Sequence, residues 1–455
     1  MLSLGDLAEP VPADLLAKYD VAGPRYTSYP TVPAWRDDFA PDDFARALRA
    51  AGATGTPVAL YGHFPYCAAK CFYCGCNAVT TSRPEAIDRY LDDLERELDC
   101  VVGELGRFHR TAQLHWGGGT PNHLDDRQLE RAFRLYADRF RFTDEVELSL
   151  EADPRLVSRE QLRTLRALGF TRISFGVQDL DRNVQEAIGR LQSPALVRDV
   201  CESAREAGFT GLNIDLIYGL PRQTPESFAR TIDEALRLGP DRVACFGYAH
   251  LPSSRPHQRV IEEAELPDAP ERAALFQLAV RRFTEAGYAW IGLDHFAKAD
   301  DPLAVAQREG RLHRNFMGYT TMPAAHLVGT GMSAISDVGG AFAQNEARLG
   351  PWRERVDAGR LSTVRGLWLS DDDRARKHAI QQLMCNLELA FDDIPPGVDD
   401  LRARFAPFED DGFVEFGVDR VQVTPRGRFF IRNLCMELDA YLPTQQGQGR
   451  FSRTV

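Results

Sequence analysis

Short apolar runs alternate with longer amphipathic stretches between about residue 57 and residue 250. Six of the runs have the length and composition of buried strands: VALYGHF (58–64), QLHW (113–116), VELSLE (146–151), RISFGV (172–177), NIDLIYG (213–219) and VACFGYA (243–249). The intervening stretches have helical periodicity, and several end in glycine, as helix C-termini often do. This alternation predicts an α/β fold with a parallel sheet. Six strands favour an incomplete (βα)6 TIM-like barrel, with a doubly wound open sheet as the alternative.

Polar residues and glycines gather where each predicted strand gives way to its loop. They are Gly117–Thr120, Glu151–Asp153, Gln178–Asp179, Asp215 and Tyr248–His250. Parallel barrels carry their active sites at that edge. We therefore expect a site assembled from several strands, although some of these residues also suit helix caps and turns.

The flanking segments predict three further units. Residues 1–56 form an arm that contains GPRYTSYPT (23–31), and residues 57–290 hold the partial barrel. Residues 291–369 are a loop-rich extension, which we expect to complete the active site because long loops in compact domains are usually functional or disordered. Residues 370–455 predict a smaller, mainly helical C-terminal domain of winged-helix-like pattern. Its mixed charge favours a packing or lid role over nucleic-acid binding.

Composition narrows the class of protein. The 455 residues are 44% hydrophobic and 26% charged, which is ordinary for a soluble globular protein. The formal charge of −12 argues against binding to nucleic acid or to an anionic membrane. No apolar run approaches the roughly 18 residues that cross a bilayer, and the N-terminus lacks the pattern of a secretory signal. We expect a cytoplasmic protein.

The nine cysteines are unevenly distributed. Cys67, Cys71, Cys74 and Cys76 fall within YGHFPYCAAKCFYCGCN, and the other five are scattered among apolar or helical surroundings. The scattered five are expected to be buried small hydrophobic residues. In a reducing compartment, the cluster indicates a metal site more than a disulfide framework.

The spacing of the four clustered cysteines distinguishes two kinds of metal site. Tetrahedral zinc usually uses two separated C-x2-C or C-x2-H pairs. Only Cys71 and Cys74 have that spacing, so zinc stays open with His63 or Cys76 as the fourth ligand. Iron–sulfur clusters accept closely spaced thiolates from one loop. C-x3-C-x2-C can hold three irons of a cube and leave the fourth open, which indicates catalysis rather than electron storage.

The cysteine spacing after a first barrel strand resembles the radical S-adenosylmethionine (SAM) signature. The complete chain resembles the oxygen-independent coproporphyrinogen III oxidases. The resemblance extends over nearly the whole chain through GPRYTSYPT, LHWGGGTP, GVQD, NIDLIYGLPRQTPESF, YAHLP, AVAQREG, LHRNFMGYTT, GMSAIS and TPRGRFFIRN. The cysteine motif alone identifies only the superfamily, whereas Cys76 in CGCN, the arm and HRNFMGYTT narrow it to this family.

The resemblance implies a 4Fe–4S cluster bound by Cys67, Cys71 and Cys74, with SAM on the open iron. The cluster would be strongly reducing, toward the low end of the roughly −700 to +450 mV that such clusters span. An electron from a low-potential donor would split SAM, and the resulting 5′-deoxyadenosyl radical would take hydrogen from a propionate, which then loses carbon dioxide. Two propionates of coproporphyrinogen III would become vinyl groups of protoporphyrinogen IX, in haem biosynthesis. A monomer is expected.

The resemblance also implies roles for individual residues. Gly118, Gly119 and Thr120 match a glycine-rich loop near SAM. Further matches are to positions that contact one or other of two SAM molecules: Glu151, Gln178, Arg190, Asp215, Ala249 and Ile335. Tyr61 is expected to cover the first SAM, and Tyr73 stands where the family often has phenylalanine. Cys76 is assigned a functional but unspecified role.

The sequence leaves open which residues anchor the substrate and whether the chain has a different function. Arg25, Arg308, Arg311 and Arg314 are reasonable anchors for the four propionates, although arginines on loops are commonly only solvated. One alternative function is haem binding or transfer on the same scaffold, but such relatives usually lack the fourth cysteine and the RYTSYPT arm. Another is a zinc-stabilised module that binds nucleic acid through the C-terminal domain, against which the acidic balance counts.

Overall fold

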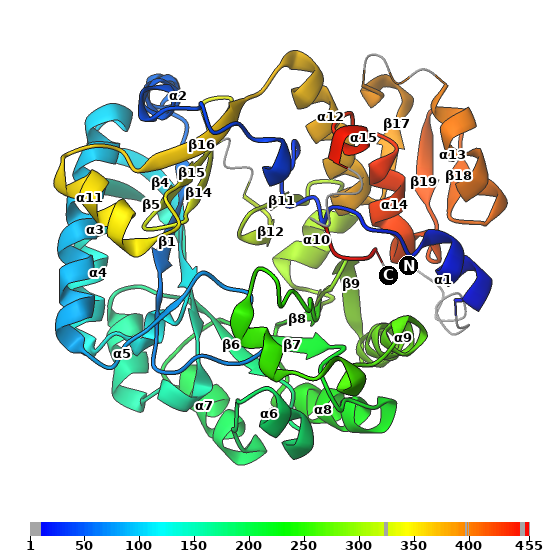
Figure 1. Ribbon diagram of the computed structural model, residues 1–455, viewed down its shortest axis with the longest axis horizontal. Helices are drawn as coiled ribbons and strands as arrows, with labels where there is room; N and C mark the ends of the chain where they lie inside the picture. Colours follow the sequence, from blue (N-terminus) through cyan, green and yellow to red (C-terminus); the bar gives the residue numbers. More distant parts are fainter. Residues whose placement is uncertain (1–10, 323–325, 396–397, 399, 446–450, 455) are drawn as a thin grey trace.

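The six predicted strands all form, and they lie side by side in chain order (Figure 1). The computed structural model describes residues 11–322, 326–395, 398, 400–445 and 451–454. The six parallel strands are β1 (Val58–Phe64), β4 (His109–Gly118), β5 (Phe140–Ala152), β6 (Arg172–Gln178), β7 (Gly211–Tyr218) and β8 (Arg242–Gly247). Because their order never reverses, the sheet is wound in one direction. The partial barrel is confirmed, and the doubly wound alternative is wrong.

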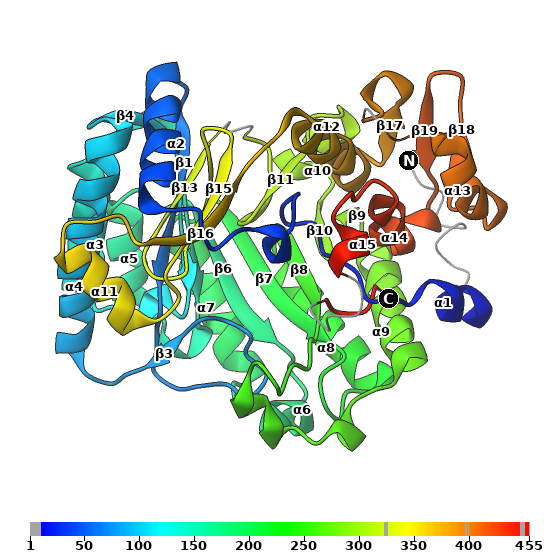
Figure 2. The same ribbon diagram turned by 45° about the horizontal axis from the view of Figure 1, so that its top comes forward.

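Helices connect these strands and cover the outer face of the sheet (Figures 1 and 2). They are α3 (Pro84–Leu105), α4 (Asp126–Ala137), α5 (Arg159–Ala167), α6 (Arg182–Ala187), α7 (Pro194–Glu206) and α8 (Pro225–Leu238). Polar side chains cap their N-termini: Asp125 accepts from the Gln128 amide (2.7 Å), and Ser158 from the Gln161 amide (3.1 Å). Such a cap contributes about 1 kcal/mol to stability.

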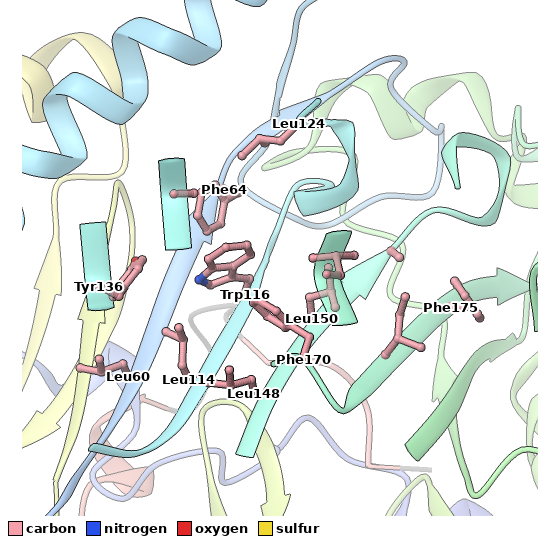
Figure 3. Packing of buried hydrophobic residues seen from close by; sticks show 14 of the residues in the cluster. Leu60, Phe64, Leu114, Trp116, Leu124, Tyr136, Leu148, Leu150, Phe170 and Phe175 are labelled. Carbon is pink, nitrogen blue, oxygen red and sulfur yellow. The ribbon is translucent and has the colours of Figure 1, made fainter. Parts of the chain in front are cut away.

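Successive side chains along each strand face alternately the hydrophobic core and the barrel lumen. On β4, Leu114 and Trp116 are fully buried in the layer between sheet and helices (Figure 3). The Trp116 ring packs against Phe64 and Phe170, with centroids 5.0 and 4.7 Å away. The intervening His115 lines a cavity inside the barrel. Because successive side chains point to opposite faces of a strand, the pattern that builds the core also presents polar groups to the lumen.

The segment 291–369 contains more regular structure than its sequence indicates. After α9 (Ala269–Glu285), strands extend the sheet at both edges, so that the described residues form one twelve-stranded sheet. One edge gains β9 (Tyr288–Gly292) and β10 (His295–Lys298), and the other gains β13 (Leu327–Thr330), β14 (Ile335–Val338), β15 (Ala341–Asn345) and β16 (Thr363–Trp368). β13 pairs parallel to β1 and brings this extension against the first barrel strand.

Other elements of this segment are α10 (Pro302–Arg308), α11 (Leu349–Asp357) and the hairpin of β11 (His313–Asn315) and β12 (Gly318–Thr320). Glu97 on α3 holds the extension in place. Its carboxylate accepts hydrogen bonds from the Gly331 amide (2.5 Å), Asn345 (2.9 Å), Trp352 (2.9 Å) and Ser362 (2.7 Å). Four donors satisfy a buried carboxylate that would otherwise be strongly destabilising.

The N-terminal arm and the C-terminal unit share a second hydrophobic core. The arm contains α1 (Ala13–Tyr19) and α2 (Pro41–Thr54), two helices that the sequence analysis above does not predict. The C-terminal unit has the predicted helix, hairpin and helix. Its elements are α12 (Asp371–Gln381), β17 (Glu388–Ala390), α13 (Leu401–Asp410), β18 (Val414–Phe416), β19 (Arg420–Val423), α14 (Ile431–Met436) and α15 (Leu442–Gln445). Tyr19 packs against Phe408 and Phe413, with centroids 5.3 and 5.0 Å away.

The described C-terminal residues 451–454 return to the arm beside α9 and α14 (Figures 1 and 2). Ala22 forms an antiparallel bridge with Arg453. In the part of the chain that the structure describes, every helix is too short or too polar to cross a bilayer.

Candidate active site

Cys67, Cys71 and Cys74 line one cavity of about 690 Å³ at the carboxyl end of the barrel strands, called here the cluster cavity. Their loop follows β1 and is held at several points. The short strands β2 (Tyr66–Cys67) and β3 (Val79–Thr80) pair with each other, and His257 contacts the Cys74 carbonyl at 2.6 Å. The loop therefore presents three thiols to a common space that is large enough for a cofactor.

Each of the three sulfurs has a hydrogen-bond donor from the chain itself. Thr120 Oγ1 donates to Cys67 Sγ (3.2 Å), Arg190 Nη1 to Cys71 Sγ (3.6 Å) and the Cys76 amide to Cys74 Sγ (3.4 Å). A further hydrogen bond, from the Cys76 side chain, lowers the pKa of Cys74 to about 6. Donors of this kind stabilise thiolates and adjust the potential of an iron–sulfur cluster.

The surroundings fit a cluster better than a single zinc ion. Both ring nitrogens of His63 are engaged, Nδ1 with Tyr61 Oη (3.1 Å) and Nε2 with the Asn77 carbonyl (3.0 Å). Among the described residues, no three His, Cys, Asp or Glu side chains converge closely enough to hold one metal ion. A cube of four irons instead keeps its thiolate ligands well apart, which suits three cysteines spread around one cavity.

The packing of the protein itself requires glycine at two positions of the glycine-rich loop. Gly118 has φ of 112°, and a Cβ there would lie 2.5 Å from the His63 ring. A Cβ on Gly119 would lie 2.5 Å from the Pro65 backbone. The sequence reading attributed these glycines to close approach of a ligand, and the structure adds that β1 and its loop already fill the side-chain positions.

Two carboxylates with different acidity lie at the centre of the site. Burial by itself raises the pKa of Glu151, but His115 and the Gly118 amide (3.1 Å) outweigh it and hold that pKa below its ordinary value. Burial and the charge of Glu151 raise the pKa of Asp215 to about 7. Near neutral pH, Glu151 is therefore an acceptor only, whereas Asp215 can also donate a hydrogen bond.

Arg190 is anchored beside the cysteine loop. It donates to Asp153 Oδ2 (3.0 Å) and to the Gly176 carbonyl (2.6 Å), and Arg155 binds the same carboxylate (2.7 Å). Burial opposes ionisation of Asp153, but the two arginines hold its pKa below the ordinary range. Asp153 thus fixes both guanidinium groups next to Cys71.

Every residue predicted for the site lines the cluster cavity or a neighbouring cavity of about 340 Å³. Tyr61 and Ile335 line only the smaller cavity, where Tyr61 stacks on His115 with centroids 6.1 Å apart. The predicted residues that line the cluster cavity but not the smaller one are Cys67, Cys71, Tyr73, Cys74, Gly119, Thr120, Gln178, Arg190, Asp215 and Ala249. Cys76, Gly118 and Glu151 line both, so the two cavities adjoin at these residues.

Sequence reasoning missed several residues of the site. His115 contacts Glu151 (Nε2 to Oε1, 3.6 Å), and Arg155 contacts Cys71 Sγ (3.9 Å). Met317 lines the smaller cavity from the HRNFMGYTT motif. His115 and Met317 lie inside motifs that carried the resemblance, so a residue-by-residue reading of those motifs would have found them. Nothing near Arg155 in the sequence marks it.

Comparisons with known proteins agree with this geometry. The chain matches the radical SAM superfamily over residues 61–235. It is 43% identical over 450 residues to the oxygen-independent coproporphyrinogen III oxidase of Escherichia coli (strain K12), with 97% of this chain and 98% of that protein covered. It is 42% identical to the enzyme of the same name from Pseudomonas aeruginosa, with the same coverage. The chain belongs to the oxygen-independent coproporphyrinogen III oxidases.

A solved structure of this oxidase family has the same fold. Coproporphyrinogen III oxidase from Escherichia coli, described as a radical SAM enzyme, matches with a TM-score of 0.89 and 41% identity, covering 95% of this chain and 100% of that one. The predicted family and fold class are confirmed. Membership makes the chain a radical SAM enzyme, and it implies a 4Fe–4S cluster and SAM. The haem-transfer alternative is not favoured, because the relatives are named as oxidases.

The four arginines suggested as propionate anchors in this oxidase lie in different surroundings. Arg308 and Arg311 are exposed and bind the Ala299 carbonyl and Glu309. Arg314 is buried and donates to the Arg25 carbonyl (2.9 Å). Arg25 itself pairs with Asp294 in a cavity away from the cysteines.

Proposed function

We propose that this enzyme converts two propionate side chains of coproporphyrinogen III to vinyl groups without oxygen, giving protoporphyrinogen IX in haem biosynthesis. The observation that carries the proposal is the cluster cavity, in which three thiols, a glycine loop and two carboxylates meet. The relatives that share this chain's length and 40–43% of its residues are named for this reaction.

Cys67, Cys71 and Cys74 would hold the cluster through their sulfurs. When bound, the cluster and SAM supply a carbon-centred radical that can take a hydrogen atom from an unactivated carbon. The chain itself contributes the groups that position SAM. The carboxylate of Glu151, held in place by the Gly118 amide, offers an acceptor on one side, and Arg190 offers a cation on the other. These groups suit the ammonium, hydroxyl and carboxylate groups of SAM.

The protonation of Asp215 adds a second kind of contact. Because its pKa is about 7, Asp215 is partly protonated at neutral pH. Ser174 Oγ (3.0 Å) and Asn213 Nδ2 (2.7 Å) donate to it and fix its orientation. Such a group suits a ribose hydroxyl, which both donates and accepts. The propionate loses a hydrogen atom, carbon dioxide and one electron, so an acceptor for that electron is also required.

Several finer features are part of the proposal. Two adjoining cavities that share Glu151 and Gly118 support two SAM molecules. We further propose that the enzyme is a monomer. We also propose a cytoplasmic location, a separate low-potential electron donor, no nucleic-acid or membrane partner, and the division into arm (1–56), barrel (57–290), extension (291–369) and C-terminal domain (370–455).

Anaerobic reconstitution followed by assay tests the proposal. Purified enzyme should bind about four irons and four sulfides per chain, as a 4Fe–4S cluster requires. With SAM, a low-potential reductant and coproporphyrinogen III, it should form protoporphyrinogen and 5′-deoxyadenosine. Fully loaded enzyme that forms neither product would overturn the proposed function, and stoichiometric zinc in place of iron would overturn the cofactor assignment.

A further inference from the structure

A separate cavity of about 60 Å³ lies between the arm, the barrel and the C-terminal unit. Its charged lining consists of Arg25, Arg272, Arg428, Arg432 and Asp294, and we call it the arginine cavity. Arg272 lies in α9, and Arg432 lies in α14. Figures 1 and 2 both show these helices converging beside the chain ends.

Positive charge in the arginine cavity exceeds negative charge. Leaving aside Arg272, which already contacts another group, the described lining has three arginines and one carboxylate, Asp294. That carboxylate is already used: it accepts from Arg25, and His295 Nδ1 lies 2.8 Å from its other oxygen. Burial raises the pKa of Asp294, but Arg25 and the hydrogen bond with His295 outweigh it and hold that pKa well below its usual range. A buried charge without a counter-charge is strongly unfavourable.

Arg432 has hydrogen bonds but no acidic partner among the described residues. Its guanidinium is 7% exposed and donates to the carbonyls of Pro24 (3.0 Å), Arg453 (2.7 Å) and Gly23. Carbonyl oxygens satisfy the N–H groups without neutralising the charge. Burial and the nearby charge of Arg25 lower the pKa of Arg432 to about 10, so it remains a cation at neutral pH.

Arg428, which lines this cavity, has an unsatisfied donor. The residue is 5% exposed, its Nη2 donates to the Trp290 carbonyl, and its guanidinium carbon lies 4.3 Å from the Trp290 ring centroid. Within the described residues, its buried Nε has no hydrogen-bond partner. A native protein rarely leaves such a donor unsatisfied without a ligand or water to accept from it. Arginine donors are well matched to carboxylates.

The arginine cavity lies at the same end of the barrel as the cluster cavity. Tyr218, the last residue of β7, lines the arginine cavity. Its hydroxyl lies 2.9 Å from where a Cβ on Gly247 would be, and Gly247 lines the cluster cavity. The two cavities are therefore neighbours across the ends of β7 and β8. A volume of about 60 Å³ admits the end of a side chain but not a macrocycle.

We propose that the arginine cavity is a carboxylate-binding subsite that takes a propionate of the substrate. The inference rests on the proposed function, because the substrate named there carries four propionates. A propionate that reacts in the cluster cavity leaves the others to bind elsewhere at the mouth of the barrel. A carboxylate in the cavity would neutralise excess charge of Arg428 and Arg432, neither of which pairs with an acidic side chain among the described residues. A free small anion such as acetate offers the same chemistry.

Binding without turnover tests the subsite. The probe is coproporphyrin III, the stable oxidised form of the substrate, added to cluster-loaded full-length enzyme under anaerobic conditions, with quenching of protein fluorescence as the readout. Arg428→Gln and Arg272→Gln should each weaken binding about tenfold, the effect of losing a hydrogen bond to a charged group. The exposed Arg281 lies on the same helix as Arg272. Arg281→Gln is the matched control and should bind as the parent enzyme does.

A second arm separates the two carboxylate sources. Binding of the tetramethyl ester of coproporphyrin III should not change in either variant, because the ester lacks carboxylates. If acetate raises the thermal midpoint of the parent enzyme but not of Arg428→Gln, while coproporphyrin III binds all variants equally, the subsite serves a free anion and its assignment to the substrate is overturned. Unchanged affinity together with no effect of acetate would overturn the subsite altogether.

The outcomes stay distinct from those of the proposed function. If the enzyme binds coproporphyrin III through the arginine cavity but forms no protoporphyrinogen, only the proposed function is refuted. Normal turnover together with unchanged affinity for coproporphyrin III in both variants would refute only the proposed subsite. Arg272 is half-buried, so Arg272→Gln keeps the test available if Arg428→Gln does not fold.

Discussion

The cluster cavity and the arginine cavity lie at the same end of the barrel but are assembled in different ways. Three thiols of the first come from eight consecutive residues, and its other groups stand at the ends of successive strands. The second joins residues far apart in the chain: Arg432 donates to the Gly23 carbonyl across 409 positions. The first site is thus encoded in local motifs. The second exists only once the arm and the C-terminal unit have folded against the barrel.

The largest expected effect tests whether the cysteine motif holds the iron–sulfur cluster in the cluster cavity. Cys71→Ser should lose bound iron and all turnover, because serine is a poor substitute for a thiolate ligand. The fold should survive, since the substitution changes one atom. Cys100→Ser, at a half-buried position outside the cavity, is the control and should retain iron and activity. Iron analysis and circular dichroism check both variants. A Cys71→Ser enzyme that keeps its iron would show that the motif does not hold the cluster.

The glycine loop should be the next most sensitive feature. Gly118→Ala requires a strained φ of 112° and pushes on the His63 ring. Together these effects should lower the free energy of unfolding by about 3 kcal/mol. Gly103→Ala on α3 meets no atom within 4 Å and should instead stabilise the chain by up to about 1 kcal/mol. Denaturant unfolding measures both. Equal stability of the two variants would mean that packing does not demand Gly118.

The arginine cavity should depend on long-range contacts for stability. Arg432→Met removes donors to the backbone carbonyls of Gly23, Pro24, Ser452 and Arg453 and should lower the free energy of unfolding by about 2 kcal/mol. Iron content should stay unchanged, because the cluster cavity is built separately. Arg163→Met at an exposed position on α5 is the control, with an expected change within about 0.5 kcal/mol. Loss of iron in Arg432→Met would contradict the separation of the two regions.

A further prediction concerns the pH dependence of the cluster cavity. The folded pKa of Asp215, about 7, lies above the ordinary value of 3.8, so its stabilising effect is complete below that ordinary value. It is lost as the pH rises toward 7, by at most about 1.4 kcal/mol per pH unit. Asp215→Asn should therefore gain stability relative to the parent chain as the pH rises from 4 to 7. Unfolding at a series of pH values checks this, and parallel profiles would contradict it.

The sequence predicts the barrel and the cluster cavity because both follow from local patterns. Leu114 and Trp116 alternate with Gln113 and His115, so one strand supplies core and lumen together. The cysteine spacing and the motifs at the strand ends then identify the chemistry. The individual site residues came from the family resemblance, and in the structure they surround two adjoining cavities.

The remaining features could not be predicted for physical reasons. β13, with four residues, is too short for its alternation to be distinguished from a loop, yet it pairs with β1. The helix α2 is different, because PDDFARALRAAGAT has amphipathic helical spacing and acidic residues in its first turn, so the sequence could have predicted it. The ion pair of Arg25 and Asp294 joins residues 269 positions apart. Such contacts depend on tertiary packing, which no local spacing reports.

The most direct test of the central claim follows one hydrogen atom. Coproporphyrinogen III deuterated on the propionate carbons is incubated anaerobically with cluster-loaded enzyme, SAM and a low-potential reductant, and the 5′-deoxyadenosine is examined by mass spectrometry. If three thiolates hold a cluster that activates SAM beside the substrate, deuterium should appear in the 5′-deoxyadenosine as vinyl groups form. Vinyl formation with unlabelled 5′-deoxyadenosine would contradict the claim.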